Sequence, residues 1–245
     1  GLATRGETVD DIVAGAQVMR AHARKVEAPE GAIDTCGTGG LGWTSLNTST
    51  AVALVAAGAG AIVAKHGNRS KSKAGSADVL EALGVNLSPT DAQIQASFRD
   101  AGVAFMFAPA HHAAMKHVAP VRAALGIRTI FNMMGPLANP AGVKRQVLGV
   151  FAPEWVGPFA DALQALGVER ALVVHGVDGM DEISTTGATL VADIKDGQVR
   201  MQDLTPERMG VRRAGMHELR GGSVEHNAEQ LLQVLAGKEG AFADL

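Results

Sequence analysis

The stretch of sequence that best indicates the fold is Asp34–Gly42, which reads DTCGTGGLG. A short apolar run leads into it, and Asn47, Ser49 and Thr50 follow it at the start of an apolar helix. Glycines let backbone N–H groups approach an anion closely, and hydroxyls at a helix N-terminus add donors where the helix dipole already favours negative charge. The pattern predicts a phosphate site, with a tight strand-to-helix turn capped by Ser or Thr as the alternative. Its spacing fits neither a Walker A loop nor a dinucleotide-binding fingerprint.

Short apolar runs alternate with helical stretches beyond Pro29. The strand candidates are Ala32–Cys36, Ala61–Lys65, Val103–Phe107, Thr129–Phe131, Gln146–Phe151 and Ala171–His175. Thr90 and Gln93 form a capping box at the start of one helix, and Asn227 and Gly237 mark the limits of the last one. Strands that alternate with helices predict an α/β fold with a mostly parallel central sheet flanked by helices.

Two segments lie outside this alternation. Residues 9–20 place their apolar side chains on one helical face behind the capping residue Thr8, which predicts an amphipathic helix before the sheet. Residues 189–203 alternate apolar and polar side chains around Asp196-Gly197, a strong hairpin signal. We therefore expect an antiparallel ribbon appended to the parallel sheet.

Composition limits the classes of protein to consider. A chain of 245 residues, 47% hydrophobic and 19% charged, is long enough for one large globular domain and is unlike a disordered chain. Lys and Arg number 22 against 25 Asp and Glu, so no global basic field favours nucleic acid or a membrane surface. The single cysteine, Cys36, excludes an internal disulfide and a multi-cysteine zinc site. The most apolar run, Ala51–Ala64, is too short to cross a membrane, and we expect a cytoplasmic protein.

A second polar segment follows the next predicted strand. Lys65–Arg69 reads KHGNR, and residues 70–76 continue it with hydroxyl side chains and two more lysines. Cations near a glycine-rich loop are suitable countercharge for a polyphosphate, although a basic loop alone is usually just solvated. Because both loops follow neighbouring strands, we expect them to form one site.

Acidic and imidazole side chains are the remaining candidates. Asp181 and Glu182 follow a predicted strand, and adjacent carboxylates in a loop suit Mg²⁺, with a solvated acidic turn as the alternative. His111, His112 and His117 lie on a predicted helix, but their spacing does not fit an H-x-x-x-H zinc site. The sequence therefore favours magnesium over zinc.

These motifs occur together in a specific order. They are Gly37–Gly40, Asn47–Thr50, Lys65–Arg69, Gly75–Asp78, Arg128 with Gly135–Pro140, and Asp181-Glu182. The ordered set resembles the signature of the anthranilate phosphoribosyltransferase family of tryptophan biosynthesis. The resemblance implies a nucleoside phosphorylase-like fold with a small helical domain, a homodimer, and use of phosphoribosyl diphosphate with Mg²⁺.

The resemblance also implies roles position by position. The family's contacts to phosphoribosyl diphosphate match Gly37, Thr38, Gly39, Gly40, Asn47, Ser49, Thr50 and Lys65. Its contacts to anthranilate match Gly37, Asn68, His112, Arg122, Gly135 and Pro136. Its metal ligands match Ser49, Asp181 and Glu182. Arg122 is suited to pair with the substrate carboxylate.

The chain departs from the family pattern in three places. Leu41 stands where the family usually has Asp, and the loop between Arg69 and Gly75 is one residue shorter. Family chains also carry further helices before residue 1 and after Leu245. Residues 1–29 are then expected to be what remains of the small helical domain, which helices near 111–126 join, and residues 30–245 to be the α/β domain that binds phosphoribosyl diphosphate.

The resemblance implies transfer of a 5-phosphoribosyl group to the amine of anthranilate with release of diphosphate. One rival is a pyrimidine nucleoside phosphorylase, which shares the implied fold but lacks the Asp181-Glu182 pair and the Lys65–Arg69 run. Another is a non-catalytic relative that binds nucleic acid through basic loops, against which the net charge of −3 counts. We expect small-molecule substrates, and neither nucleic acid nor membrane as a partner.

Overall fold

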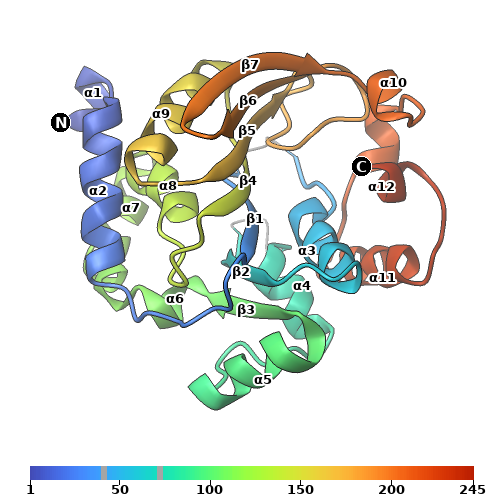
Figure 1. Cartoon of the computed structure of the whole chain (residues 1–245), viewed down its shortest axis with the longest axis horizontal. Helices are drawn as coiled ribbons and strands as arrows, with labels where there is room; N and C mark the ends of the chain where they lie inside the picture. Colours follow the sequence, from blue (N-terminus) through green and yellow to red (C-terminus); the bar gives the residue numbers. More distant parts are fainter. Residues whose placement is uncertain (40–42, 71–73) are drawn as a thin grey trace.

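The computed structural model describes residues 1–39, 43–70 and 74–245 (Figure 1). Its strands are β1 (Ile33–Gly37), β2 (Val63–Gly67), β3 (Val103–Phe107), β4 (Arg145–Gly149), β5 (Arg170–Gly176), β6 (Thr189–Lys195) and β7 (Gln198–Leu204). Its helices are α1 (Leu2–Arg5), α2 (Val9–Ala21), α3 (Thr48–Gly58), α4 (Ser76–Ala82), α5 (Asp91–Ala101), α6 (Ala108–His111), α7 (Ala119–Leu125), α8 (Phe131–Met134), α9 (Val156–Ala165), α10 (Pro206–Met209), α11 (Val224–Leu235) and α12 (Ala241–Asp244). Short 3₁₀ turns cover Ala113–His117, Gly135–Leu137, Pro153–Trp155 and Met216–Leu219.

All seven strands form one sheet in the order β3-β2-β1-β4-β5-β6-β7. The first five are parallel, and β6 and β7 are antiparallel. Strands β2 and β3 lie on one side of β1 and β4 lies on the other, so the strand order reverses between β1 and β4. Ligands of open α/β sheets bind outside the carboxyl ends of the strands at such a reversal. The topology therefore places the candidate site after β1 and β4.

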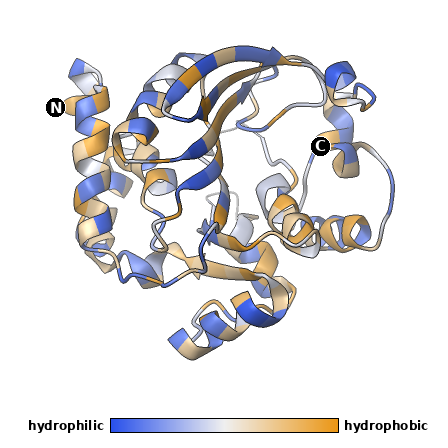
Figure 2. Ribbon diagram, viewed as in Figure 1, coloured by the Kyte–Doolittle hydropathy of each residue, from blue (hydrophilic) through white to orange (hydrophobic). Residues whose placement is uncertain are grey.

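Helices cover both faces of the sheet, which confirms the predicted α/β class. Figure 1 shows α2, α8 and α9 on one side and α3 and α11 on the other. The largest core cluster joins Ile12 and Ala16 of α2 to Phe159 and Leu163 of α9 and to residues of β4, β5 and β6. Figure 2 shows hydrophobic and hydrophilic bands along α2, as its sequence periodicity predicts. The division into a helical remnant and an α/β domain stays a prediction.

Three local predictions are confirmed by the structure. The ribbon turns at Asp196 (φ 51°) and Gly197 (φ 74°), the left-handed pair that a two-residue hairpin needs. Thr8 caps α2 by accepting from the N–H of Asp11, and Thr90 forms the predicted capping box with Gln93.

Three local predictions are wrong. The predicted strand Thr129–Phe131 instead leads into α8, which begins at Phe131, and the Asn132 side chain accepts from the Thr129 N–H at 3.0 Å. A run of three residues is too short to fix a strand. The helix predicted to begin at Asn227 is α11, which begins at Val224 behind the cap Ser223, so Asn227 lies inside it, and α12 follows it in the chain. The histidine segment is broken into α6, a 3₁₀ turn and α7, with a proline at the start of α7.

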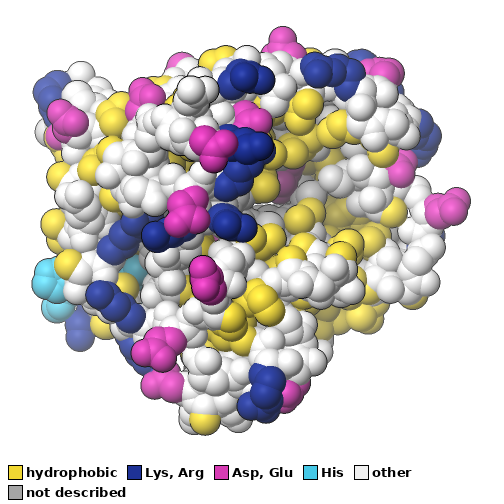
Figure 3. Space-filling view, in the orientation of Figure 1, with side chains coloured by type: hydrophobic (Ala, Val, Ile, Leu, Met, Phe, Trp, Pro, Cys, Tyr) yellow, Lys and Arg dark blue, Asp and Glu magenta, His cyan; other side chains and the backbone are white. Residues whose placement is uncertain are grey.

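Charges on the outer surface are mixed. On the face shown in Figure 3, Lys and Arg side chains are interspersed with Asp and Glu. No helix among the described residues is long and apolar enough to cross a membrane.

Candidate functional site

The carboxyl ends of β1 and β4 hold a buried carboxylate between two glycines. Gly37 and Gly149 are paired in register, and the N–H of Thr38 donates to the carbonyl of Gly149 at 2.9 Å. The N–H of Gly39 donates to Asp181 Oδ2 at 2.7 Å. A Cβ on Gly149 would lie 1.6 Å from the carbonyl oxygen of Asp181, and one on Gly37 would lie 2.3 Å from Asp181 Oδ2. Only glycine at both positions leaves room for this carboxylate loop.

The neighbouring acids Asp181 and Glu182 are held in a poorly hydrated environment. Asp181 is 8% exposed, and burial raises the pKa of its carboxyl above the ordinary value. Burial and the charge of Asp181 raise the pKa of Glu182 well above its ordinary value, and Lys65 opposes that shift. Two such carboxylates have unbalanced negative charge that a cation would offset.

This donor set fits Mg²⁺ held partly by a substrate. Within the described ranges, no group of three or more His, Cys, Asp or Glu side chains could hold a metal. Mg²⁺ is commonly bound by one or two carboxylates plus substrate phosphates. Asp181 and Glu182 therefore fit as its protein ligands. The predicted third ligand, Ser49, accepts from the ammonium of Lys65 at 3.2 Å through its hydroxyl.

Lys65 lies buried between β1 and the start of α3. Its ammonium donates to the Thr35 carbonyl at 2.7 Å and to Ser49 Oγ at 3.2 Å. Burial lowers the pKa of Lys65 and the charge of buried Asp34 opposes that shift. Asp34 in turn accepts from the His66 N–H and from Asn139 Nδ2. This network fixes one cation beside the N-terminus of α3.

The two predicted phosphate loops are tied together by side chains of α3 and its cap. Asn47 Nδ2 donates to the carbonyl of Ala74 at 2.9 Å. Thr50 Oγ1 donates to Ser76 Oγ, also at 2.9 Å. These bonds connect Asn47 and Thr50 to Ala74 and Ser76, and that both loops form one ligand site stays a prediction. Gly40, Leu41 and Ser72 lie outside the described residues.

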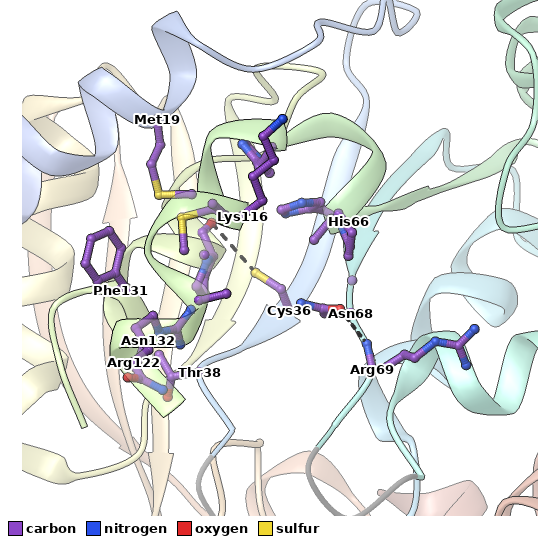
Figure 4. Close-up of a pocket in the computed structure, with 18 of the residues that line it drawn as sticks. Met19, Cys36, Thr38, His66, Asn68, Arg69, Lys116, Arg122, Phe131 and Asn132 are labelled. Carbon is purple, nitrogen blue, oxygen red and sulfur yellow. Dashed lines mark hydrogen bonds between the residues drawn. The ribbon is translucent and has the colours of Figure 1, made fainter. Parts of the chain in front are cut away.

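A cavity of about 650 Å³ opens beside this edge of the sheet. It is lined by all six residues predicted for the aromatic acid, namely Gly37, Asn68, His112, Arg122, Gly135 and Pro136. Figure 4 shows Cys36 between two walls, with His66 and Asn68 on one side and Phe131 and Arg122 on the other. Gly37 is common to the cavity and to the carboxylate loop, so the two parts of the site are adjacent.

Two imidazoles in the cavity wall are kept neutral by burial. The rings of His66 and His112 lie 5.1 Å apart in an edge-on arrangement. Burial first, and then the neighbouring His112, lower the pKa of His66 to about 3. Burial also lowers the pKa of His112. Within the described part of the chain, the buried Nε2 atoms of both rings have no hydrogen-bond partner. Each ring therefore has a buried nitrogen whose hydrogen-bonding capacity the described residues leave unused.

Cations line the cavity, and none of its described lining residues is acidic. Arg122 lies over the ring of Phe131, 5.7 Å from its centroid, and Lys116 lies on the 3₁₀ turn before α7. Arg69 extends away from the cavity (Figure 4), where Asp78 and Glu81 pair with its guanidinium. Arg122 and Lys116 thus give this wall a positive charge that suits an anionic ligand.

Sequence reasoning assigned no individual binding or positioning role to several residues of this site. They are Met19, Cys36, His66, Lys116 and Phe131 in the cavity, and Asp34, Thr35, Asn139 and Asn227 in the supporting network. His66 stood within the KHGNR run and could have been found from its place at the end of a strand. Asn227 carried no usable signal, because its partner Ser45 is 182 residues away.

Comparisons with known proteins agree with this arrangement. The sequence model described as glycosyl transferase family, a/b domain, matches residues 29–245. Anthranilate phosphoribosyltransferase of Parvibaculum lavamentivorans is 59% identical over 100% of this chain and 72% of its own length. The enzyme of that name from Azorhizobium caulinodans is 54% identical with the same coverage.

Solved structures give the same result. The crystal structure of anthranilate phosphoribosyltransferase from Thermus thermophilus superposes with a TM-score of 0.93 at 48% identity, covering 99% of this chain and 73% of that one. The Saccharomyces cerevisiae enzyme in complex with PRPP and Mg superposes with a TM-score of 0.88 at 30% identity, covering 97% and 68%. With the site geometry described above, these matches show that the chain belongs to the anthranilate phosphoribosyltransferase family of glycosyl transferases.

Proposed function

We propose that this chain transfers the 5-phosphoribosyl group of phosphoribosyl diphosphate to the amine of anthranilate and releases diphosphate. The main observation behind the proposal is that two parts of the site meet at Gly37 and Thr38. On one side of it lie the carboxylates and N–H donors suited to Mg²⁺ and phosphates, and on the other lies the cation-lined cavity. An aromatic acid in the cavity would have its amine close to a ribose held at the edge of the sheet.

The diphosphate side would be held by fixed donors. The backbone N–H groups after β1, the N-terminus of α3 and the ammonium of Lys65 all favour negative charge at this edge. Because Lys65 is fixed by Thr35 and Ser49, it needs little reorganisation when charge develops on the leaving group. Bound Mg²⁺, held by Asp181 and Glu182, would neutralise part of the departing diphosphate's charge.

The anthranilate side needs orientation more than proton transfer. An aromatic amine is neutral and nucleophilic at pH 7, so no strong general base is required. Arg122 would pair with the carboxylate, and its stacking on Phe131 limits the directions its guanidinium can take. Neutral His66 and His112 can exchange hydrogen bonds with the substrate without adding charge beside the reacting amine. Alignment of the amine with the ribose C1 would then supply much of the rate.

Assembly and location are part of the same proposal. We propose a cytoplasmic homodimer in which residues 1–29 and helices near 111–126 form the small helical domain. The backbone N–H of Arg24 donates to the carbonyl of His111 at 2.8 Å, which supports an association of these two segments. Sedimentation of the purified chain over a concentration series would test the dimer.

The direct test of the proposed activity is the fluorescence of product formed from anthranilate and phosphoribosyl diphosphate with Mg²⁺. We expect turnover that requires all three components. The control reaction supplies thymidine or uridine with inorganic phosphate, which a pyrimidine nucleoside phosphorylase would cleave. Nucleoside cleavage without anthranilate turnover would reject the proposal in favour of that rival.

A further inference from the structure

The segment Arg220–Gly221 pairs with Thr44–Ser45, which follow the glycine-rich loop. Ser45 and Arg220 form an antiparallel bridge, and the N–H of Gly221 donates to the carbonyl of Thr44 at 2.9 Å. A Cβ on Gly221 would lie 2.3 Å from the carbonyl oxygen of Ser45, so the two backbones meet at a distance that only glycine permits. Segments from opposite ends of the sequence are therefore held in direct contact.

The side chain of Asn227, in the first turns of α11, stabilises this contact with hydrogen bonds to both segments. Its side chain is 1% exposed. Its Nδ2 donates to Ser45 O at 3.1 Å and to Asn47 Oδ1 at 2.9 Å, while its Oδ1 accepts from the N–H of Gly222 at 2.8 Å. Both amide hydrogens and the oxygen are used, as expected of a buried amide that contributes to a unique structure.

The connection continues through Asn47 to the second loop. Asn47 Oδ1 accepts from Asn227, and Asn47 Nδ2 donates to the carbonyl of Ala74 at 2.9 Å. The orientation of both amides is determined by their outer partners, because the Gly222 N–H can only donate and the Ala74 carbonyl can only accept. The chain Asn227–Asn47–Ala74 therefore has one arrangement, and it leaves a single N–H of Asn47 for a ligand.

We propose that Asn227 is a positioning residue that orients Asn47 and, through it, couples residues 44–47 to Ala74 and the start of α4. Its effect on catalysis rests on the proposed function, since Asn47 is a predicted contact of phosphoribosyl diphosphate. No metal, proton transfer or contact between Asn227 and substrate is involved.

Asn227→Asp tests the connection with a side chain of nearly the same shape. The Asp carboxylate cannot donate, so it faces two acceptors, Ser45 O and Asn47 Oδ1. Asn47 can relieve the second conflict only by turning its amide, which places its oxygen against the Ala74 carbonyl. We expect the KM for phosphoribosyl diphosphate to rise about tenfold, the loss expected for one buried hydrogen bond, and the KM for anthranilate to change less than twofold.

Leu231→Ala is the matched control on the same helix. Leu231 is fully buried against α3 and α4, so its truncation destabilises α11 without touching either amide. Leu→Ala changes in a core are at least as destabilising as the loss of one hydrogen bond. We expect Leu231→Ala to lower Tm while both KM values stay within twofold of wild type. A raised KM for phosphoribosyl diphosphate in Leu231→Ala as well would reduce Asn227 to a merely structural role and overturn the proposal.

Hydrogen exchange without any ligand tests the coupling independently of activity. In Asn227→Asp we expect faster exchange at Gly75 and Ala77, which are distant from residue 227 in sequence, and unchanged exchange at these amides in Leu231→Ala. Asn227→Ala, which introduces no charge, provides the same measurement if the Asp variant does not fold. Unchanged exchange at Gly75 and Ala77 in the folded Asn227 variant would overturn the coupling. If wild type has no phosphoribosyltransferase activity, the proposed function fails, while this measurement still decides the coupling.

Discussion

Gly149→Ala should displace the loop that carries Asp181. A Cβ at residue 149 would lie 1.6 Å from the carbonyl oxygen of Asp181, about half the distance at which carbon and oxygen atoms normally meet. Because that oxygen belongs to backbone and not to a flexible side chain, either β4 or the loop must move by more than about 1 Å. Such a displacement breaks the alignment of Asp181 with the Gly39 N–H, now 2.7 Å.

We expect kcat to fall by about 100-fold, since a shift of about 1 Å in an active site can cost that much. Overpacking of this kind also lowers stability by about 1–3 kcal/mol, or roughly 2–12 °C in Tm for a chain of this size. The assay is product fluorescence at saturating Mg²⁺ beside a thermal melt. The control is Gly157→Ala in α9, where an added Cβ meets nothing within 4 Å and helix propensity predicts neutral or slightly higher stability. Wild-type kcat and Tm in Gly149→Ala would refute the reasoning.

The same geometry supports three further predictions. Arg122→Ala should raise the KM for anthranilate about 10- to 150-fold, the range for a lost charge-assisted hydrogen bond, and steady-state kinetics showing an equal rise for phosphoribosyl diphosphate would contradict it. Asp181→Asn and Glu182→Gln should each lower kcat strongly, with only partial rescue by excess Mg²⁺. Their ligand-free melts should show higher Tm at pH 7 but not near pH 3, because the raised carboxyl pKa values mean that ionisation opposes folding as pH rises. Phosphoribosyl diphosphate should protect residues 37–50 and 65–76 together from hydrogen exchange, and protection of one segment alone would show that they are separate sites.

Local patterns in the sequence were sufficient for the elements whose signals lie within a few residues. The Asp196-Gly197 turn and the caps at Thr8 and Thr90 depend on short-range hydrogen bonds and backbone preferences, and all three were predicted. The strand predicted at Thr129–Phe131 is wrong because a run of three residues does not distinguish a strand from the start of a short helix.

The candidate site was predicted in part for the same reason. Glycines, hydroxyls and charges at the ends of strands pointed to the edge of the sheet where the candidate site lies and to the acidic pair, and the ordered motifs identified the family. The sequence by itself thus determined the class of fold, and the family resemblance picked out six of the residues that line the cavity.

Only the tertiary structure decided which groups support those residues and how closely they approach. The fit of Asp181 against Gly37 and Gly149, the neutral pair His66 and His112, and the connection from Asn227 to Asn47 all join segments that are far apart in the chain. Their geometry depends on the order of strands in the sheet and on the packing of α11 against α3 and α4, and no local pattern carries that information. Burial is the largest cause of the direction in which the pKa values of the acids and imidazoles move, because desolvation opposes the charged form of each group.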